Sequence, residues 1–119
     1  MAKKIKEIVS KEETFDRLEI RLGKVVSVEI EPKAPKPAYK ILADFGKFGK
    51  MASVGRFTNH PPEELTSHLI LGVLNFENRK IGETESEFLC LGVQFPKCDS
   101  GEATFVTSAH NAKIGSKLF

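Results

Sequence analysis

The feature that most constrains the fold is a succession of short β-type runs separated by turn-forming residues. Within each run, apolar residues either alternate with polar ones or are continuous, which is typical of strands with one or both faces buried. Glycine and proline, which interrupt regular strands, recur between the runs. The predicted strands are residues 18–30, 39–45, 50–54, 68–74, 87–91 and 103–107. This pattern predicts an all-β domain.

Helix signals are few. The segment Ser10–Glu13 matches a capping box ahead of Phe15, so we expect a helical turn at about residues 11–17. The segment Thr58–Leu65 combines a polar capping candidate, prolines near the first turn and two glutamates, which predicts a short helix. Short strands with one small helix between the third and the fourth predict a five-stranded barrel of the OB type.

The first predicted strand contains an interruption. Its apolar face is formed by alternating residues, namely Ile20, Leu22, Val26, Val28 and Ile30. Lys24 breaks the alternation, and Gly23 immediately before it predicts a bulge or a sharp bend that lets one strand serve both sides of a small barrel. Alternatively, Lys24 extends its charged end outward from an inward-facing position.

The stretch Asn75–Val93 contains β-type residues around a basic, glycine-bearing loop. Arg79 and Lys80 stand beside Gly82, which permits backbone conformations that a side chain opposes. Strands on either side of the loop would present these two cations at a fixed place on the surface. Four phenylalanines occupy strand positions typical of the core, and we expect them to be packed inside: Phe45, Phe76, Phe88 and Phe105.

Composition sets broad limits. The chain has 119 residues, which fits one domain, and a net charge of +2 with a pI near 8.5 is only mildly basic. A local basic patch would therefore matter more than the total charge. No apolar run is long enough to span a bilayer, and the first residues lack the apolar core of a secretory signal. We expect a cytoplasmic protein without membrane insertion, with its two cysteines reduced.

Enzyme chemistry finds little support in the sequence. Cys90 lies in an apolar run typical of a buried residue, and Cys98 does not form a zinc-binding spacing with it. The three histidines are scattered, and none has the partner of a helical metal pair: His60, His68 and His110. Phosphate-loop and dinucleotide fingerprints are absent from the sequence. We predict no catalytic residue, no metal site and no cofactor.

Several segments in unbroken order resemble a known family. They are Phe15–Val26, Lys36–Ile41, Pro62–Leu65, Asn75–Gly82, Ser86–Leu89 and Gly115–Phe119. Over residues 14–119 the chain resembles the CsaA-type tRNA-binding domain, whose relatives include domains of methionyl-tRNA synthetases and of phenylalanyl-tRNA synthetase β chains. The resemblance implies an OB-fold homodimer. It further implies that an arm at residues 1–13 and a C-terminal segment after about residue 107 form the dimer interface.

The resemblance also implies which residues face RNA. They are Arg21, Lys24, Ser53, Asn75, Arg79, Lys80 and Ser86. Three further cations near the predicted hairpin add to this basic surface: Lys40, Lys50 and Arg56. Where the family usually has prolines and apolar residues around the loop arginine, this chain has Glu77, Glu83 and Glu85, which repel phosphate.

Two functions follow as expectations from this resemblance. The first is non-catalytic binding of tRNA, recognised by its folded shape because aromatic residues for stacking are scarce. The alternative is a CsaA-like, export-related chaperone that binds unfolded or precursor polypeptides. RNA binding should weaken steeply with salt, whereas binding through apolar burial should not.

Overall fold

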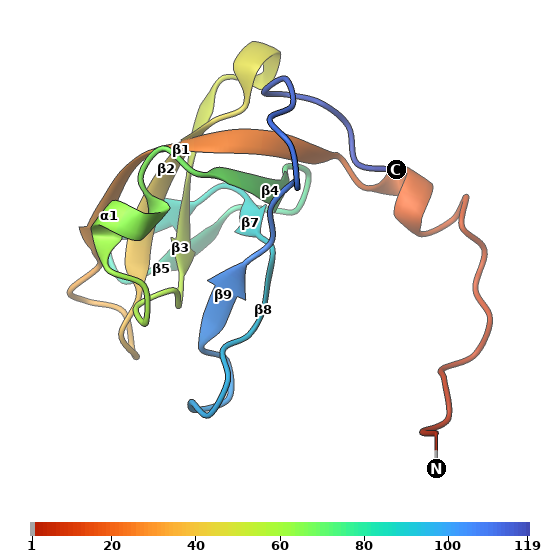
Figure 1. Ribbon diagram of the computed structural model, residues 1–119, viewed down its shortest axis with the longest axis horizontal. Helices are drawn as coiled ribbons and strands as arrows, with labels where there is room; N and C mark the ends of the chain where they lie inside the picture. Colours follow the sequence, from red (N-terminus) through yellow and green to blue (C-terminus); the bar gives the residue numbers. More distant parts are fainter. Residues whose placement is uncertain (1) are drawn as a thin grey trace.

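Five strands form one antiparallel sheet that curls into a barrel (Figure 1). The computed structural model describes residues 2–119, so Met1 of the predicted arm lies outside the described residues. The order of the strands in the sheet is β3-β2-β1-β4-β7. Their bounds are β1 Ile20–Ile30, β2 Tyr39–Asp44, β3 Lys50–Gly55, β4 Leu69–Val73 and β7 Leu89–Cys90. The predicted OB-type barrel is confirmed.

The barrel closes between its two edge strands. The amide of Glu87, just before β7, donates to the carbonyl oxygen of Ala52 on β3 at 2.7 Å. The carboxylate of Glu87 accepts from the amide of Ala52 at 2.9 Å. Glu87 therefore satisfies both the amide and the carbonyl of Ala52, at the place where β3 would otherwise be an open edge.

Two small ribbons and short helices complete the fold. The ribbons pair β5 (Arg79–Ile81) with β6 (Thr84–Ser86), and β8 (Gly92–Gln94) with β9 (Ala103–Phe105). The helix α1 (Pro62–Leu65) lies between β3 and β4, as predicted. The 3₁₀ helix η1 (Phe15–Arg17) follows a turn, which confirms the predicted helical turn, and η2 (Gly46–Phe48) lies between β2 and β3.

The inward-facing residues of β2 form a large part of the barrel core. Tyr39, Ile41 and Ala43 alternate on this face, and Phe45 follows them without any exposed surface. Phe45 packs edge-to-face on Phe88, with ring centroids 4.9 Å apart. The burial of both rings confirms their predicted core positions.

Gly23 lies where β1 changes partner, as predicted, because residues up to Lys24 pair with β4 and those from Lys24 onward pair with β2. It also has a packing role. A side chain there would place its Cβ 2.5 Å from Cε1 of Phe45, so the glycine makes room for that ring. The bulge lies further along β1, where the register with β2 shifts between Val25 and Ser27. Val25 is buried in the core, whereas Val26 and Ile30 are exposed, so the predicted apolar face is wrong at these two residues. Val28 packs partly against the core, as predicted.

The last predicted strands are also corrected. In the run predicted at residues 87–91, the strand β7 spans only Leu89–Cys90, and the amide of Leu91 adds one more bond to β4. The backbone and side chain of Glu87 instead close the barrel against β3. The run predicted at 103–107 does not join the barrel. Its first part forms β9, which pairs with β8 in a separate ribbon.

The two ends of the described chain differ in their contacts. Residues 2–10 contain no helix or strand and are exposed, and Figure 1 shows them running away from the barrel. The C-terminal tail instead adds to β1 on the side that β2 leaves open. Gly115 donates to the carbonyl of Leu22 at 2.7 Å, Leu22 donates to that of Ser116 at 2.9 Å, and Leu118 donates to that of Ile20 at 3.1 Å. The tail therefore behaves as an irregular edge strand.

Candidate nucleic-acid interface

The loop predicted between two strands is itself a hairpin. Arg79 pairs with Ser86 across it, and Lys80 pairs with Glu85. Gly82 in the two-residue turn has φ = 62°, a conformation that favours glycine. The hairpin gives the two cations fixed positions, as predicted from the sequence, but it does so with its own backbone pairing.

A small pocket of about 250 Å³ lies between this hairpin and β3. Its lining brings together three of the predicted residues, Ser53, Arg79 and Ser86. The hydroxyl of Ser86 accepts from the amide of Val54 at 3.2 Å and lies 3.5 Å from the buried hydroxyl of Ser53. The remaining lining residues are Val54, Phe76, Glu77, Ile81, Glu87, Phe88 and Leu89.

The hairpin is anchored to the proline-rich loop before β2. The buried carboxylate of Glu31 accepts hydrogen bonds from the hydroxyl of Thr84 and, at 3.0 Å, from the amide of Lys33. The hydrogen bond from Thr84, followed by that from Lys33, lowers the pKa of Glu31 below its ordinary value. An ion pair of 3.2 Å between Lys33 and Glu83 adds an exposed contact at the tip.

The hairpin cations are available to a ligand. Arg79 and Lys80 are exposed, and within residues 2–119 neither forms an ion pair. Lys40 on β2 is exposed and lies opposite Val54, a lining residue of the pocket. We name these three cations the hairpin cluster, defined as Lys40, Arg79 and Lys80; Lys40 also lies opposite Glu29, and Lys80 opposite Glu85.

Two further predicted lysines lie in another row of the sheet. Lys24 on β1 and Lys50 on β3 are both exposed and flank Asp44 of β2. The carboxylate between them reduces the positive potential of this row. The structure therefore brings Lys24 and Lys50 together with each other, and not with the pocket.

Three predicted residues have other partners in the fold. Asn75 accepts from the amide of Glu19 at 2.8 Å and donates to the carbonyl of Arg17 at 2.9 Å, which ties β4 to the start of β1. Arg21 contacts Glu19 at 2.7 Å and the C-terminal tail. Arg56 contacts Glu102 at 3.4 Å and donates to the carbonyl of Ser100 at 3.0 Å.

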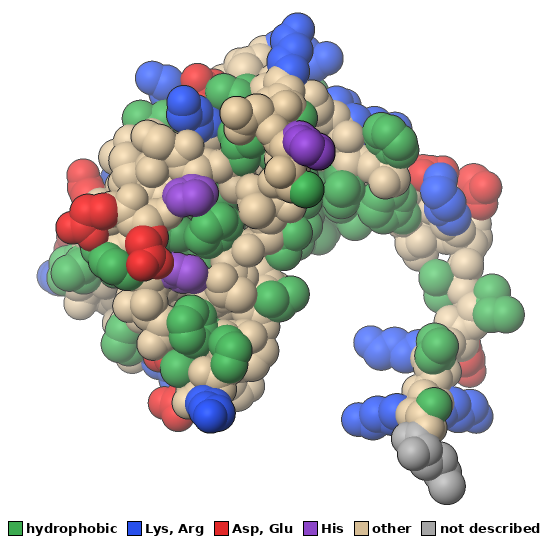
Figure 2. Space-filling model, viewed as in Figure 1, with side chains coloured by type: hydrophobic (Ala, Val, Ile, Leu, Met, Phe, Trp, Pro, Cys, Tyr) green, Lys and Arg blue, Asp and Glu red, His purple; other side chains and the backbone are tan. Residues whose placement is uncertain are grey.

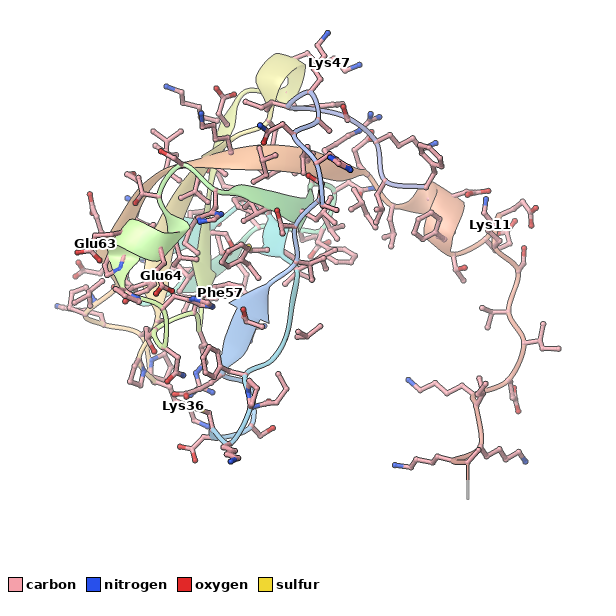
Figure 3. The ribbon with its side chains drawn as sticks, viewed as in Figure 1. Lys11, Lys36, Lys47, Phe57, Glu63 and Glu64 are labelled. Carbon is pink, nitrogen blue, oxygen red and sulfur yellow. The ribbon has the colours of Figure 1, made fainter. Side chains whose placement is uncertain are left out.

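Charged side chains are spread over the surface. Figure 3 shows Lys47 at one end of the barrel and Lys36 at the opposite end, with Glu63 and Glu64 on α1 between them. In Figure 2, acidic side chains gather over α1, whereas basic ones lie at the edges of this face. The face seen in these views therefore does not form a continuous basic patch, and the hairpin cluster is the better candidate for contact with RNA.

An apolar cleft of about 370 Å³ adjoins the hairpin on its other side. It lies between the proline-rich loop and the end of β3, with Ala34, Pro35, Phe57, Ile81 and Leu89 among its lining residues. Lys36 and Arg56 also line it. This cleft was not predicted from the sequence, because its walls come from segments that are far apart in the chain.

Cys90 is buried, and His60 links two elements of the fold. Burial raises the pKa of the Cys90 thiol to about 12, which disfavours the reactive thiolate. The ring of His60 contacts Glu64 at 2.8 Å and Thr104 at 2.9 Å, so it joins α1 to β9. Within the described part of the chain, no group of three or more potential ligands is placed to hold a metal ion, and no helix is long and apolar enough to cross a membrane.

Comparison with known proteins shows what the chain is similar to. No family model matches the chain. The methionine–tRNA ligase of Pyrococcus horikoshii is 30% identical over 107 residues, which cover 89% of this chain and 14% of the ligase. That of Pyrococcus abyssi is 28% identical, covering 95% of this chain and 15% of the ligase. The chain thus spans only about one seventh of the length of these ligases.

Solved structures match over nearly the whole chain. The CsaA chaperone protein of Picrophilus torridus superimposes with a TM-score of 0.83 at 28% identity, covering 94% of this chain and 100% of that one. In sequence and fold, the chain is similar to this CsaA protein. Chaperone CsaA of Bacillus anthracis gives a TM-score of 0.80 at 27% identity, with the same coverage. A MetRS-related protein of P. horikoshii, at 21% identity and a TM-score of 0.80, shares the fold.

Sequence reasoning missed two parts of this CsaA-like site. Phe76 was expected in the core but is 49% exposed and lines the pocket, so that prediction is wrong. Phe76 follows Asn75 just after the apolar run of residues 68–74, and β4 ends before it, at Val73. The second missed part is the hairpin and its anchor. The two-residue Gly82–Glu83 turn between short β-type segments is a recognisable hairpin pattern, but no local pattern marks Glu31 as the residue that holds the hairpin.

Proposed function

We propose that this CsaA-like domain binds tRNA without catalysing a reaction on it. The observation that carries the proposal is the hairpin cluster, in which Arg79 and Lys80 are exposed on an anchored two-strand ribbon and Lys40 is exposed opposite Val54, which lines the same pocket as Arg79. Fixed cations next to hydroxyl groups suit phosphate and ribose oxygens, because each phosphate contact releases counterions. Similarity to a segment of methionine–tRNA ligases supports tRNA as the nucleic acid.

The test is a titration of labelled bulk tRNA at about 50 and 200 mM salt, with duplex DNA as competitor. Engagement of roughly four to six phosphates predicts a loss of several hundred-fold or more in affinity over this range. Arg79→Glu should abolish binding, whereas Lys11→Glu, on the far side of η1, should leave most of it. Absence of tRNA binding at low salt, or equal loss in both variants, would contradict the proposed site.

We further propose that the protein is a homodimer. The resemblance to CsaA-type proteins motivates this, and the protomer leaves three apolar side chains without cover at its ends: Ile5, Ile8 and Phe119. Burial of such residues against a second copy would remove apolar surface from water. Analytical ultracentrifugation should show a dimer, and removal of residues 1–10 should shift it towards monomer. A monomer at micromolar concentration would refute this part.

The apolar cleft favours a second candidate function. Its walls of proline, alanine and leucine suit an extended apolar segment of an unfolded polypeptide, and two structural neighbours are described as CsaA chaperone proteins. Binding of a labelled unfolded polypeptide should then depend little on salt. Ala34→Glu, which places a charge in the cleft, should reduce polypeptide binding and spare tRNA binding. The opposite result would assign the cleft to the RNA site.

A further inference from the structure

The pocket beside the hairpin presents flat apolar surface to solvent. Phe76 is 49% exposed and Leu89 is 48% exposed, although both belong to residue types that are usually buried. Both line the 250 Å³ pocket together with Ile81. Aromatic and aliphatic side chains of this kind form a stacking surface for a nucleobase. A phosphate or ribose would gain little from them.

The charge of the pocket also argues against a phosphate inside it. Two carboxylates, Glu77 and Glu87, and a single cation, Arg79, are among its lining residues. One oxygen of Glu87 already accepts from the amide of Ala52. Glu77 is exposed, and no ion pair involves it in the part of the chain that the structure describes. A free carboxylate attracts N–H donors and repels phosphate.

We propose that this pocket receives one unpaired guanine of the bound RNA. Phe76 stacks on the base, Glu77 accepts from the N1–H and N2–H groups, and Arg79 donates to O6 or N7. Guanine is the base that suits both charged groups, because it alone offers two adjacent N–H donors on one edge and two acceptors on another. The inference rests on the proposed RNA-binding function and names the base that the site selects.

The flanking phosphates then lie outside the pocket. Lys80 and Lys40 are exposed and do not line the pocket, so they are free to take these phosphates while the base enters between the hairpin and β3. Under this division of roles, the carboxylates near Arg79 do not simply weaken RNA binding. Glu77 lowers the attraction for phosphate, and it also lets the pocket distinguish one base from the others.

The experiment uses seven-nucleotide RNAs of uridine that carry G, A, C or U at the centre. Fluorescence anisotropy with the full chain at roughly 50 mM salt gives the four affinities. We expect the guanine RNA to bind tighter than the adenine RNA by roughly fivefold to a hundredfold, the range for one good bidentate contact. Phe76→Ala should weaken binding of the guanine RNA by a similar factor, through lost stacking.

A pair of variants isolates the carboxylate. Glu77→Gln should remove most of the preference for guanine over adenine and leave binding of all-uridine RNA equal or slightly tighter. Glu85→Gln is the matched control, because it removes the same charge from the same hairpin at an exposed position that does not line the pocket. It should keep the preference. Circular dichroism confirms that each variant is folded.

The outcomes separate this inference from the function on which it rests. If tRNA and all four short RNAs fail to bind, the proposed function and the inference both fail. If tRNA binds with the expected salt dependence but the four RNAs bind equally, only the guanine pocket is refuted. Equal, uniform tightening by Glu77→Gln and Glu85→Gln would show that both glutamates merely repel phosphate, which also overturns the proposal.

Discussion

The hydroxyl of Thr84, on the hairpin, donates a hydrogen bond to the buried carboxylate of Glu31, which lies 53 residues earlier in the chain. This contact joins the hairpin to the end of β1, and the hydrogen bond from Val54 to Ser86 joins it to β3. The turn glycine fits against the same carboxylate, since a Cβ on Gly82 would approach a Glu31 oxygen to 2.7 Å. The orientation of Arg79 and Lys80 therefore depends in part on one acidic side chain.

The pH dependence of stability tests this anchor. Hydrogen bonds from Thr84 and Lys33 lower the pKa of Glu31 below its ordinary 4.5, so its contribution is fully present above pH 4.5. It is lost as the pH falls further, through the folded-state pKa. We expect the difference in free energy of unfolding between the wild type and Glu31→Gln to be constant from pH 7 to about 5, and to shrink below 4.5.

Urea unfolding at a series of pH values measures this difference. Hydrogen exchange provides the local control: in Glu31→Gln, amides of residues 79–86 should exchange faster while those of β2 keep their rates. A difference that is independent of pH down to pH 3 would show that the carboxylate charge does not contribute. Uniformly faster exchange would show a general loss of stability instead.

Thiol reactivity tests the burial of Cys90. Because its pKa is raised to about 12 from 9.0, the thiolate fraction near pH 8 is lower by roughly three orders of magnitude than for an ordinary thiol. Native protein treated with a thiol reagent should therefore modify Cys98, which is partly exposed, and leave Cys90 intact. Cys98→Ser should react only after denaturant is added. Rapid reaction of native Cys98→Ser would contradict the burial of Cys90.

Close packing at Gly23 gives a stability prediction. Gly23→Ala drives a methyl group into the ring of Phe45, and overpacking of this kind costs about 1–3 kcal/mol. Urea unfolding should show this loss. The double variant with Phe45→Leu, which opens space at the contact, should lose less than the sum of the two single variants. Full additivity would mean that the glycine is required for another reason.

Much of the barrel was predictable because its strands carry local signals. Tyr39, Ile41, Ala43 and Phe45 alternate as expected of β2, and prolines at α1 mark the helix before β4. The bulge after Val25 was not predictable, since nothing in the residues Val25–Ser27 distinguishes it from a regular strand. Lys24 indicated an irregularity in the strand, but the bulge lies between Val25 and Ser27 and not at Gly23.

The candidate site was predictable only in part. Arg79 and Lys80 are adjacent to a glycine in the sequence, and the structure keeps them together and exposed. The contact between Glu31 and Thr84 depends on tertiary structure that leaves no local pattern. Likewise, exposure of Phe76 follows from where β4 ends, and apolar composition alone does not reveal that end.

Arg21 offers a test that separates a structural role from binding. Its guanidinium contacts Glu19 at 2.7 Å, donates to the carbonyl of Gly115 at 3.3 Å and lies 4.8 Å from the ring centroid of Phe48. The side chain is only 16% exposed, so it holds the C-terminal tail against β1. We expect Arg21→Ala to cost about 1 kcal/mol of unfolding free energy, because it loses a cation–π contact and a partly exposed ion pair.

The comparison with Arg79→Ala makes the roles distinct. Arg79 is exposed and has no ion pair among residues 2–119, so its removal should leave the urea midpoint within error while weakening tRNA binding. Arg21→Ala should instead speed hydrogen exchange at Gly115 and Leu118, whose amides bond to β1, and change tRNA affinity less than Arg79→Ala does. If Arg21→Ala weakened tRNA binding as strongly, with an unchanged tail, Arg21 would contact the RNA directly.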